Sequence, residues 1–523
     1  MTVIELAGSR LDDWWDDLMR RPRAAMIWAW GGPLFVVLVA ALARLVDLGH
    51  PHELVFDETY YVKDAWTLMH LGYEGSWPPD ANTGFNAGLT DQYQTAPSFV
   101  VHSPVGKWII AAGLATFGAG SSFGWRIAVA IAGILLVVVT MLIAKRLFKS
   151  TLLTVIAGGL LAIDGNAIVM SRVALLDTML ALLALVGAYF VLLDRGFTER
   201  RLASWMATRG ASGRPADWGP VLWWRPWLLG AAVAFGLTTG VKWSGLYFLA
   251  GFAVYVVVSE ALLRRKAGIT FWLSGAVLRQ APATFVLMVP LALAVYVASW
   301  TGWFVTKGGY YRLWIETAGG EAWKGALAWV PHSIQNWWHY QSAMYFYHVN
   351  EHTPHSYQAN PLTWLFLVRP TSMYYRDNGD GTAQTILEVA NPLIWWAATA
   401  AVFYLVFRLV RGIVKREADW RDGYILIGVA AGYLPWLLYL GRTVFQFYTI
   451  AFEPYLVLAL TVALGHLLGR STDPEPRRVV GLRVVGIFLG LCVVLSIFFW
   501  PMWTGQTIPI WYMKAHWWLP SWV

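Results

Sequence analysis

The sequence predicts an all-α polytopic membrane protein, and three observations support this fold class. Of its 523 residues, 57% are hydrophobic and only 13% are charged, whereas a soluble chain carries about 25% charged residues. The apolar residues fall in separate runs of membrane-spanning length, which one globular core does not explain. The net charge of +8 comes from cations near the ends of these runs. Such cations indicate orientation in a bilayer, and we expect no nucleic-acid partner.

About eleven apolar runs are long enough to cross a bilayer, which takes roughly 17–25 residues. The first run, 24–46, follows three arginines and lacks a cleavage site of small residues, so we expect a retained anchor. Segment 105–119 is too short to cross, and we expect it to lie along the membrane surface. The other expected spans are 123–144, 151–169, 173–193, 223–241, 243–262, 281–303, 391–410, 423–440, 444–468 and 484–501.

The distribution of Lys and Arg predicts which side each loop occupies, because cytoplasmic loops are enriched in both. With 105–119 not crossing, the N-terminus and the loops on its side hold 26 of the 39 Lys and Arg residues. We therefore expect a cytoplasmic N-terminus in the cell membrane and two large external loops, 49–122 and 304–390. Both loops are rich in Trp, Tyr, His and Pro and are too long to be simple connectors. The active site is expected on this external face.

This topology divides the chain into four parts. A cytoplasmic arm at 1–23 precedes a transmembrane domain at 24–303, which includes the first external loop. The second external loop, 304–390, leads to a C-terminal four-helix region at 391–523. The one cysteine, Cys492, lies in an apolar run, so neither a disulfide framework nor a cysteine metal site is available.

Two adjacent carboxylates, Asp57 and Glu58, lie about ten residues beyond the first span. Neighbouring side chains point in different directions on a helix or a strand, so the two need not share a task. One can face a site while the other holds the loop. An equally weighted alternative is that Asp57 only N-caps a helix running to Met69.

Charged residues recur at the outer ends of spans, where leaving them unpaired in hydrocarbon costs several kcal/mol. The cations Arg126, Arg172, Lys242 and Arg442 all fall on the face that carries Asp57. Structural ion pairs from Arg172 to Asp177 or to Asp164 are an alternative of about equal weight. Further polar residues expected to support the site are His102, Lys107, Asp164, Asp177 and His355.

This sidedness favours glycosyl transfer from a phosphate-linked lipid. Arginine can hold two phosphate oxygens at once, while a carboxylate opposite can deprotonate an attacking hydroxyl. A phosphate leaving group requires little protonation, so a second carboxylic acid of the glycosidase type is not needed.

The motifs together resemble the protein O-mannosyltransferases, which have the C-type glycosyltransferase (GT-C) fold. The likeness is carried by FDETYYVKDAW, HSPVGK, GWRIAVAIAG, IDGNAIVMSRVALLDTML, GLTTGVKWSGLY and HSYQANPLTW, in that order along most of the chain. The resemblance implies inverting transfer of one mannose from polyprenyl-phosphate-mannose to Ser or Thr of exported proteins. It makes Asp57 the general base, with Glu58 beside it shaping the acceptor or donor site. It makes Arg126 a support for that loop or for the phosphate, and Arg172 and Lys242 candidates for the donor phosphate.

Departures from the family pattern refine the expectation. Eukaryotic members carry a soluble MIR domain in the second external loop, whereas 304–390 is too short for one, so the chain resembles the bacterial, actinobacterial form. Ser103 stands where the family usually has proline. We expect no obligatory metal, although a divalent cation remains open because C-type relatives often bind one. Association with a secretion channel is a further open partner.

Three alternatives remain. A transferase of the same fold could use a lipid or polysaccharide acceptor. A transporter or flippase would place charges near the bilayer midplane, whereas these gather at outer ends. A structural membrane scaffold would leave the sided cations and Asp57 unexplained.

Overall fold

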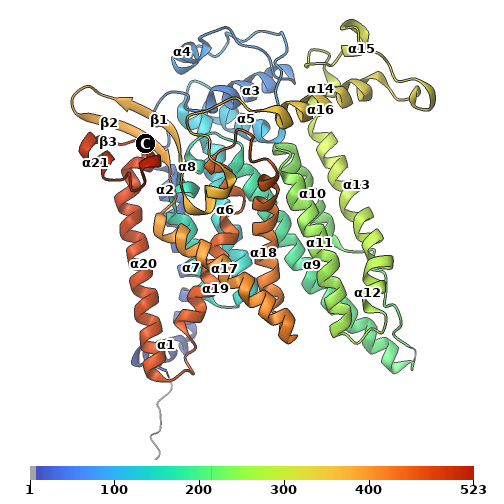
Figure 1. Cartoon of the computed structure of the whole chain (residues 1–523), viewed down its shortest axis with the longest axis vertical. Helices are drawn as coiled ribbons and strands as arrows, with labels where there is room; N and C mark the ends of the chain where they lie inside the picture. Colours follow the sequence, from blue (N-terminus) through green and yellow to red (C-terminus); the bar gives the residue numbers. More distant parts are fainter. Residues whose placement is uncertain (1–7, 214) are drawn as a thin grey trace, which may run out of the picture.

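The computed structural model describes residues 8–213 and 215–523 and is a bundle of long, roughly aligned helices with smaller elements at one end (Figure 1). The bundle helices are α2 (Pro22–Leu45), α6 (Ser122–Phe148), α7 (Thr151–Ile163), α8 (Gly165–Arg172), α9 (Asp177–Ala211), α10 (Pro226–Val241), α11 (Gly245–Lys266), α12 (Trp272–Ser274), the π-helical η1 (Gly275–Gln280), α13 (Ala281–Ser299), α17 (Pro392–Lys415), α18 (Trp420–Tyr433), α19 (Glu453–Leu468) and α20 (Glu475–Thr504).

Each of the eleven expected spans is largely helical, but the helices differ in length. Among the described residues, seven are long and apolar enough to cross a membrane, and α7 with α8 forms a broken span bent by 58°. The helices α10, α18 and α19 have only 14 to 16 residues. The count of eleven crossings therefore stays a prediction. A side chain at Gly165 would meet the Val389 carbonyl oxygen at 2.2 Å, so the bend requires a residue without Cβ.

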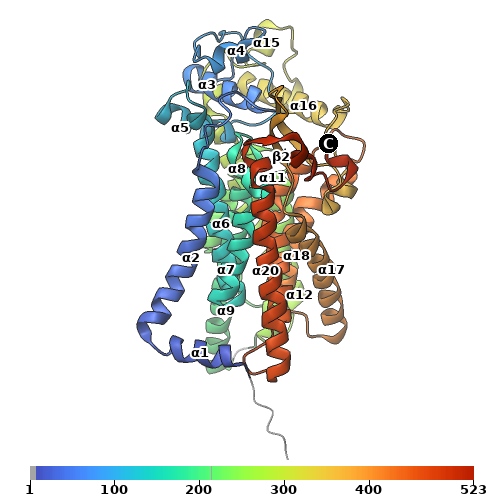
Figure 2. The ribbon, with the colours of Figure 1, turned by 90° about the vertical axis from the view of Figure 1, so that its left-hand side faces the viewer.

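Both long loops lie at the same end of the bundle, which we call the loop end (Figures 1 and 2). Helix α5 has 13 residues and is about 20 Å long, shorter than the roughly 30 Å hydrocarbon core. The elements of the loop end are α3 (Glu58–Leu71), α4 (Ala81–Asn86), α5 (Val105–Phe117), α14 (Thr301–Val305), α15 (Trp314–Thr317), the 3₁₀ turn η2 (Gly325–Leu327), α16 (His332–Asn350) and the 3₁₀ helix η3 (Pro361–Phe366).

A small antiparallel sheet also lies at the loop end, and the all-α expectation missed it. Strands β1 (Thr371–Asp377), β2 (Thr382–Glu388) and β3 (Thr507–Pro509) pair in that order. The sheet ties the second long loop to the segment after α20, where the remaining elements are α21 (Ile510–Lys514) and a 3₁₀ turn, η6 (Pro520–Trp522). The strands are too short for their pattern to stand out within a loop.

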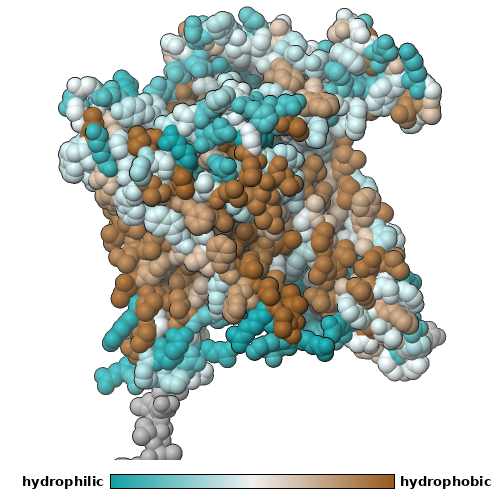
Figure 3. Space-filling view, viewed as in Figure 1, coloured by the Kyte–Doolittle hydropathy of each residue, from teal (hydrophilic) through white to brown (hydrophobic). Residues whose placement is uncertain are grey.

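The surface of the bundle carries a hydrophobic band between two polar ends (Figure 3). Large apolar side chains such as Phe403 and Phe407 of α17 are about 60% exposed, with relative accessibilities of 60% and 59%. Exposing such a continuous apolar surface to water is unfavourable in free energy, whereas contact with lipid chains is not. The chain is a multi-pass membrane protein.

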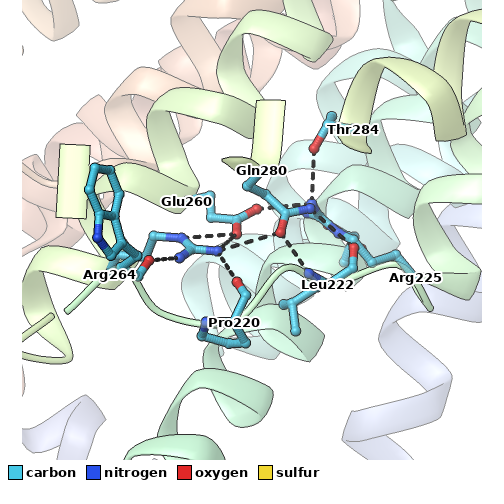
Figure 4. A network of polar contacts seen from close by, with 9 residues as sticks. Pro220, Leu222, Arg225, Glu260, Arg264, Gln280 and Thr284 are labelled. Carbon is cyan, nitrogen blue, oxygen red and sulfur yellow. Dashed lines mark hydrogen bonds and ion pairs between the residues drawn. The ribbon is translucent and has the colours of Figure 1, made fainter. Parts of the chain in front are cut away.

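The end of the bundle opposite the loop end is held by a buried network of ions (Figure 4). Arg225 pairs with Asp194 of α9 and, at 2.9 Å, with Glu260 of α11. Arg264 binds the other oxygen of Glu260, also at 2.9 Å, and the Trp218 carbonyl at 2.7 Å. Each charge thus has a partner of opposite sign, which joins helices of the bundle to the loop before α10.

The expected N-terminal arm contains one short helix near the same end, α1 (Arg10–Met19). Ser9 and Asp12 form a capping box at its start, and Asp12 also pairs with Arg478 of α20 at 2.7 Å. Residues 1–7 of the arm lie outside the described part of the chain.

Candidate functional site

Asp57 lies at the N-cap position of α3, yet its carboxylate makes no capping hydrogen bond. The explanation that it serves only as a helix cap is therefore wrong. The preceding Phe56 has a left-handed φ of 47° and packs its ring on Phe445 and Phe447, each at 5.7 Å. A bulky residue rarely adopts this conformation, and the aromatic packing holds it there. Asp57 is thus fixed at the start of α3 with its carboxylate free of capping.

Burial raises the pKa of Asp57 to about 6, while the nearby Lys242 cation opposes that rise. Asp177 also raises the pKa, and the Tyr61 hydroxyl lowers it through a hydrogen bond. At neutral pH most of the Asp57 carboxylate remains ionised and able to accept a proton. A pKa near the working pH is the range that suits a general base.

Glu58 is fully buried and is held by Arg126 through two parallel hydrogen bonds of 2.8 and 2.9 Å. Its oxygens also accept from the backbone N–H groups of Val55 and Ala174. Arg126 also donates hydrogen bonds to the carbonyls of Leu48, Pro51 and Glu53. The pair therefore holds the loop before α3 against α6 and the connection between α8 and α9, and neither partner lines the cavity described next.

A cavity of about 720 Å³ is lined by residues of α9, α11, α13, α16 and α18. Its ionisable lining includes His102, Asp177, Lys242, His348 and Arg442. The rest is mostly apolar and reaches exposed apolar side chains, among them Leu246 of α11, Leu293 of α13 and Phe346 of α16. One compartment thus offers cations at one part and a hydrocarbon surface at another.

Lys242 follows α10 and donates to the Asp177 carboxylate at 2.7 Å. Its ammonium group also lies 5.1 Å from the ring centroid of Tyr448 and 6.0 Å from that of Tyr61. Because Asp177 is occupied in this way, the alternative ion pair between Arg172 and Asp177 is wrong. No pair between Arg172 and Asp164 forms in the described chain either.

Arg442 donates to Nδ1 of His348 at 3.1 Å, and its own Nε is buried with no acceptor among the described residues. Since arginine is always a donor, Nδ1 of His348 must accept, and Nε2–H donates to the Val101 carbonyl at 2.7 Å. Burial, with the Arg442 cation, lowers the pKa of His348 to about 4, so its ring is neutral. The ring stacks on His102 at 5.2 Å.

The remaining predicted residues take supporting positions. Arg172 donates to the carbonyls at the end of α2, including Val46 at 2.8 Å, and does not line the cavity. Asp164 accepts from the backbone of Asn166 and of Asn391, which joins α8 to α17. Lys107 pairs with Glu74 and donates to the His102 carbonyl at 3.0 Å.

His355 lies on the same side of the molecule as Asp57 but is exposed. Its ring packs on Phe445 at 5.0 Å and on Phe56 at 6.0 Å, one residue before Asp57. Sequence reasoning missed His348 because it lies among many aromatic residues of the second long loop, with no motif to distinguish it. The one available sequence signal was its helical spacing from Trp337 and Gln341, which puts the three side chains on one face of α16.

Metal use stays a prediction. Within residues 8–213 and 215–523, no group of three or more His, Cys, Asp or Glu side chains is arranged to hold a metal ion. Lys242 and Arg442 supply positive charge to the cavity in any case.

The fold and the cavity define a class: a polytopic membrane protein that sets two cations and a carboxylate at one end of its helical bundle. Two family models match the chain, "Dolichyl-phosphate-mannose-protein mannosyltransferase" over residues 34–213 and "C-terminal four TMM region of protein-O-mannosyltransferase" over residues 333–522.

Curated relatives extend this likeness over nearly the whole chain. A polyprenol-phosphate-mannose–protein mannosyltransferase of Mycolicibacterium smegmatis is 32% identical, covering 94% of this chain and 93% of the relative. The proteins of that name from Mycobacterium tuberculosis and Corynebacterium glutamicum are each 30% identical, covering 93% and 90% of this chain and 90% and 88% of their own.

Among solved structures, the Saccharomyces cerevisiae Pmt1-Pmt2 complex bound to the sugar donor superposes with a TM-score of 0.70 at 14% identity, covering 94% of this chain and 92% of that one. The Archaeoglobus fulgidus oligosaccharyltransferase AglB gives 0.51 at 14% identity, with coverages of 95% and 59%. Both confirm the GT-C fold. The chain belongs to the protein O-mannosyltransferase family and is a glycosyltransferase, so the resemblance inferred from its motifs is confirmed.

Proposed function

We propose that this protein transfers a single mannose, with inversion, from polyprenyl-phosphate-mannose to Ser or Thr hydroxyls of exported proteins. The observation that carries the proposal is one cavity lined by two cations, Lys242 and Arg442, with the half-buried Asp57 close enough to Lys242 for that cation to lower its pKa. The names of the bacterial relatives support the same donor and a protein acceptor.

The donor phosphate is assigned to Lys242 and Arg442. Lys242 keeps N–H groups beyond the one that binds Asp177, and Arg442 has an Nε without a protein acceptor. Arg126 and Arg172, by contrast, spend their donors on carbonyls and on Glu58. The polyprenyl chain then follows the apolar lining toward the hydrophobic band.

Asp57 is assigned as the base that accepts the proton of the acceptor hydroxyl. The hydroxyl oxygen attacks C1 of mannose from the face opposite the phosphate, and the bond from C1 to the phosphate oxygen breaks. The bonding electrons leave with the phosphate, whose added charge Lys242 and Arg442 stabilise. Asp57 takes the proton, so the step balances without an acid catalyst.

The proposal includes the position of the reaction in the cell. The excess of Lys and Arg at the opposite end of the bundle supports a cytoplasmic location for that end, which puts the cavity on the external face of the plasma membrane. Acceptors that emerge from export on this face are still extended, so association with a secretion channel belongs to the same proposal.

The test is transfer of label from polyprenyl-phosphate-[¹⁴C]mannose by the purified protein in liposomes. A Ser/Thr-rich peptide, its Ala-substituted counterpart and a lipid acceptor are offered in parallel. Label on the Ser/Thr peptide alone, absent with Asp57→Asn, is the expected result. Label on the lipid acceptor instead would overturn the acceptor class, and transfer at the native rate by Asp57→Asn would remove Asp57 as the base.

A further inference from the structure

Besides its charged residues, the cavity has uncharged polar side chains, and these lie on the wall formed by α16. Trp337, Gln341 and His348 lie at positions i, i+4 and i+11 of α16, and all three line the cavity. This spacing puts them on one face of the helix. His348 serves Arg442, as described above, so the other two remain to be explained.

Gln341 is 8% exposed, and its Nε2 is buried with no acceptor in the described part of the chain. The indole Nε1 of Trp337, one turn earlier, is likewise buried without an acceptor. A buried donor left unpaired costs roughly 1–3 kcal/mol, so such groups are normally satisfied by protein, water or ligand. Two orphan donors on one wall of a ligand cavity indicate an acceptor supplied by the ligand.

The orientation of the Gln341 amide is fixed by its neighbours. The Tyr296 hydroxyl oxygen accepts from the indole N–H of Trp243 at 2.9 Å and from the Ser103 hydroxyl at 3.2 Å. Because Trp243 can only donate and the Ser103 hydroxyl donates to the same oxygen, the hydroxyl proton of Tyr296 is directed to Oε1 of Gln341, at 2.5 Å. Oε1 is thereby committed to Tyr296, and the NH₂ group is the half of the amide left for a ligand.

This relay also places Gln341 beside the proposed phosphate site. Trp243 directly follows Lys242 in the chain, and Ser103 directly follows His102. Both anchors of Tyr296 are thus the chain neighbours of residues that line the cavity. Ser103, which stands where the family usually has proline, thus donates one of the hydrogen bonds that orient the Tyr296 hydroxyl.

We propose that Gln341 is a specificity-determining residue whose Nε2 donates to a hydroxyl of the sugar on the lipid donor, with Tyr296 as the residue that positions its amide. The inference rests on the proposed function and adds to it the group that recognises the sugar. A neutral amide matches a neutral hydroxyl, whereas the phosphate has two cations at Lys242 and Arg442. Hydrogen bonds to a substrate hydroxyl discriminate strongly against ligands that lack it.

The experiment compares the affinities of two lipids, polyprenyl-phosphate-mannose and polyprenyl phosphate without sugar, for the full chain in nanodiscs. Gln341→Glu keeps the shape and the Tyr296 bond but loses the N–H, and Gln341→Met loses both polar atoms. We expect each to weaken binding of the mannosylated lipid about tenfold, the worth of one hydrogen bond of about 1.4 kcal/mol, and to leave polyprenyl phosphate unchanged. Tyr296→Phe should weaken binding of the mannosylated lipid by a smaller factor, because the Gln341 amide is still present but loses the hydrogen bond that orients it.

Gln384→Met is the matched control, because Gln384 lies on β2, is bonded to Thr507 and does not line the cavity. Equal weakening of both lipids by the Gln341 variants would assign the contact to phosphate and overturn the proposal, as would unchanged affinity for both. If the native chain binds the mannosylated lipid no better than polyprenyl phosphate and transfers no mannose, the proposed function itself fails.

Discussion

Two buried arginines, Arg225 at one end of the bundle and Arg442 at the loop end, are partnered in different ways. At the end opposite the loops, Arg225 places its guanidinium donors on Asp194, Glu260 and Thr284 (Figure 4). At the loop end, Arg442 has the neutral His348 as its side-chain partner, and its buried Nε has no acceptor within residues 8–213 and 215–523. The paired Arg225 serves the fold, whereas the unpaired Nε of Arg442 is a buried donor that a ligand can satisfy. Pairing alone does not separate structural from functional ions, because at the loop end Arg126 is paired with Glu58 and Lys242 with Asp177.

The strongest test of this comparison exchanges one carboxylate at each end. Asp57→Asn should lower kcat by roughly 10²–10⁴, because the proton acceptor is lost, and should leave the melting temperature nearly unchanged. Asp194→Asn should instead lower the melting temperature by several degrees, since breaking a buried pair costs about 3–5 kcal/mol. Both quantities are read on the same purified variants. A large loss of stability in Asp57→Asn would show that the two ends do not differ in kind.

The arginines provide a second matched pair. Arg442→Gln should weaken binding of polyprenyl phosphate by about ten- to a hundredfold, as expected for one charge-assisted hydrogen bond of about 1.5–3 kcal/mol to phosphate. Arg225→Gln should destabilise the protein and leave the affinity of the folded fraction unchanged. Lipid binding and thermal unfolding in nanodiscs separate the two outcomes. Unaltered lipid affinity in Arg442→Gln would remove it from the phosphate site.

The pH dependence of kcat sharpens the role of Asp57. Burial raises its pKa to about 6, so its carboxylate is ionised above that pH and becomes protonated below it. Activity should be constant above about pH 7 and fall about tenfold per unit well below pH 6. His348, with a pKa lowered to about 4, stays neutral across this range. A profile measured between pH 5 and 8 that showed no acidic decline would contradict the assignment.

The smallest effect is expected at His348. His348→Ala removes the acceptor for Arg442 and the bond to Val101, so Arg442 is less well positioned, and KM for the lipid donor should rise several-fold with little change in kcat. His348→Asn, which can still accept a hydrogen bond, should recover part of the loss. Steady-state kinetics with varied donor concentration provide the measurement. A fall in kcat without a change in KM would assign His348 to the chemical step.

Much of the site was predictable because its signals are local in the sequence. Lys242 and Arg442 were singled out as charges at the outer ends of apolar runs, and Asp57 as one of two adjacent carboxylates beyond the first span. The role of Glu58 was less predictable, because its partner Arg126 is 68 residues away. Arg172 carries the same charge as Arg442 and was likewise expected at the outer end of an apolar run, yet its donors bind carbonyls at and just after the end of α2.

The sequence by itself determined the membrane class, the sidedness of the cations and the family, because hydrophobic length, charge bias and ordered motifs are properties of the linear chain. The tertiary structure decided which charges pair: Lys242 with Asp177 across 65 residues, and Arg442 with His348 across 94. It also placed Oε1 of Gln341 where it accepts the hydrogen bond of the Tyr296 hydroxyl. Such choices depend on which side chains packing brings within about 3 Å of each other, and local sequence does not encode that distance.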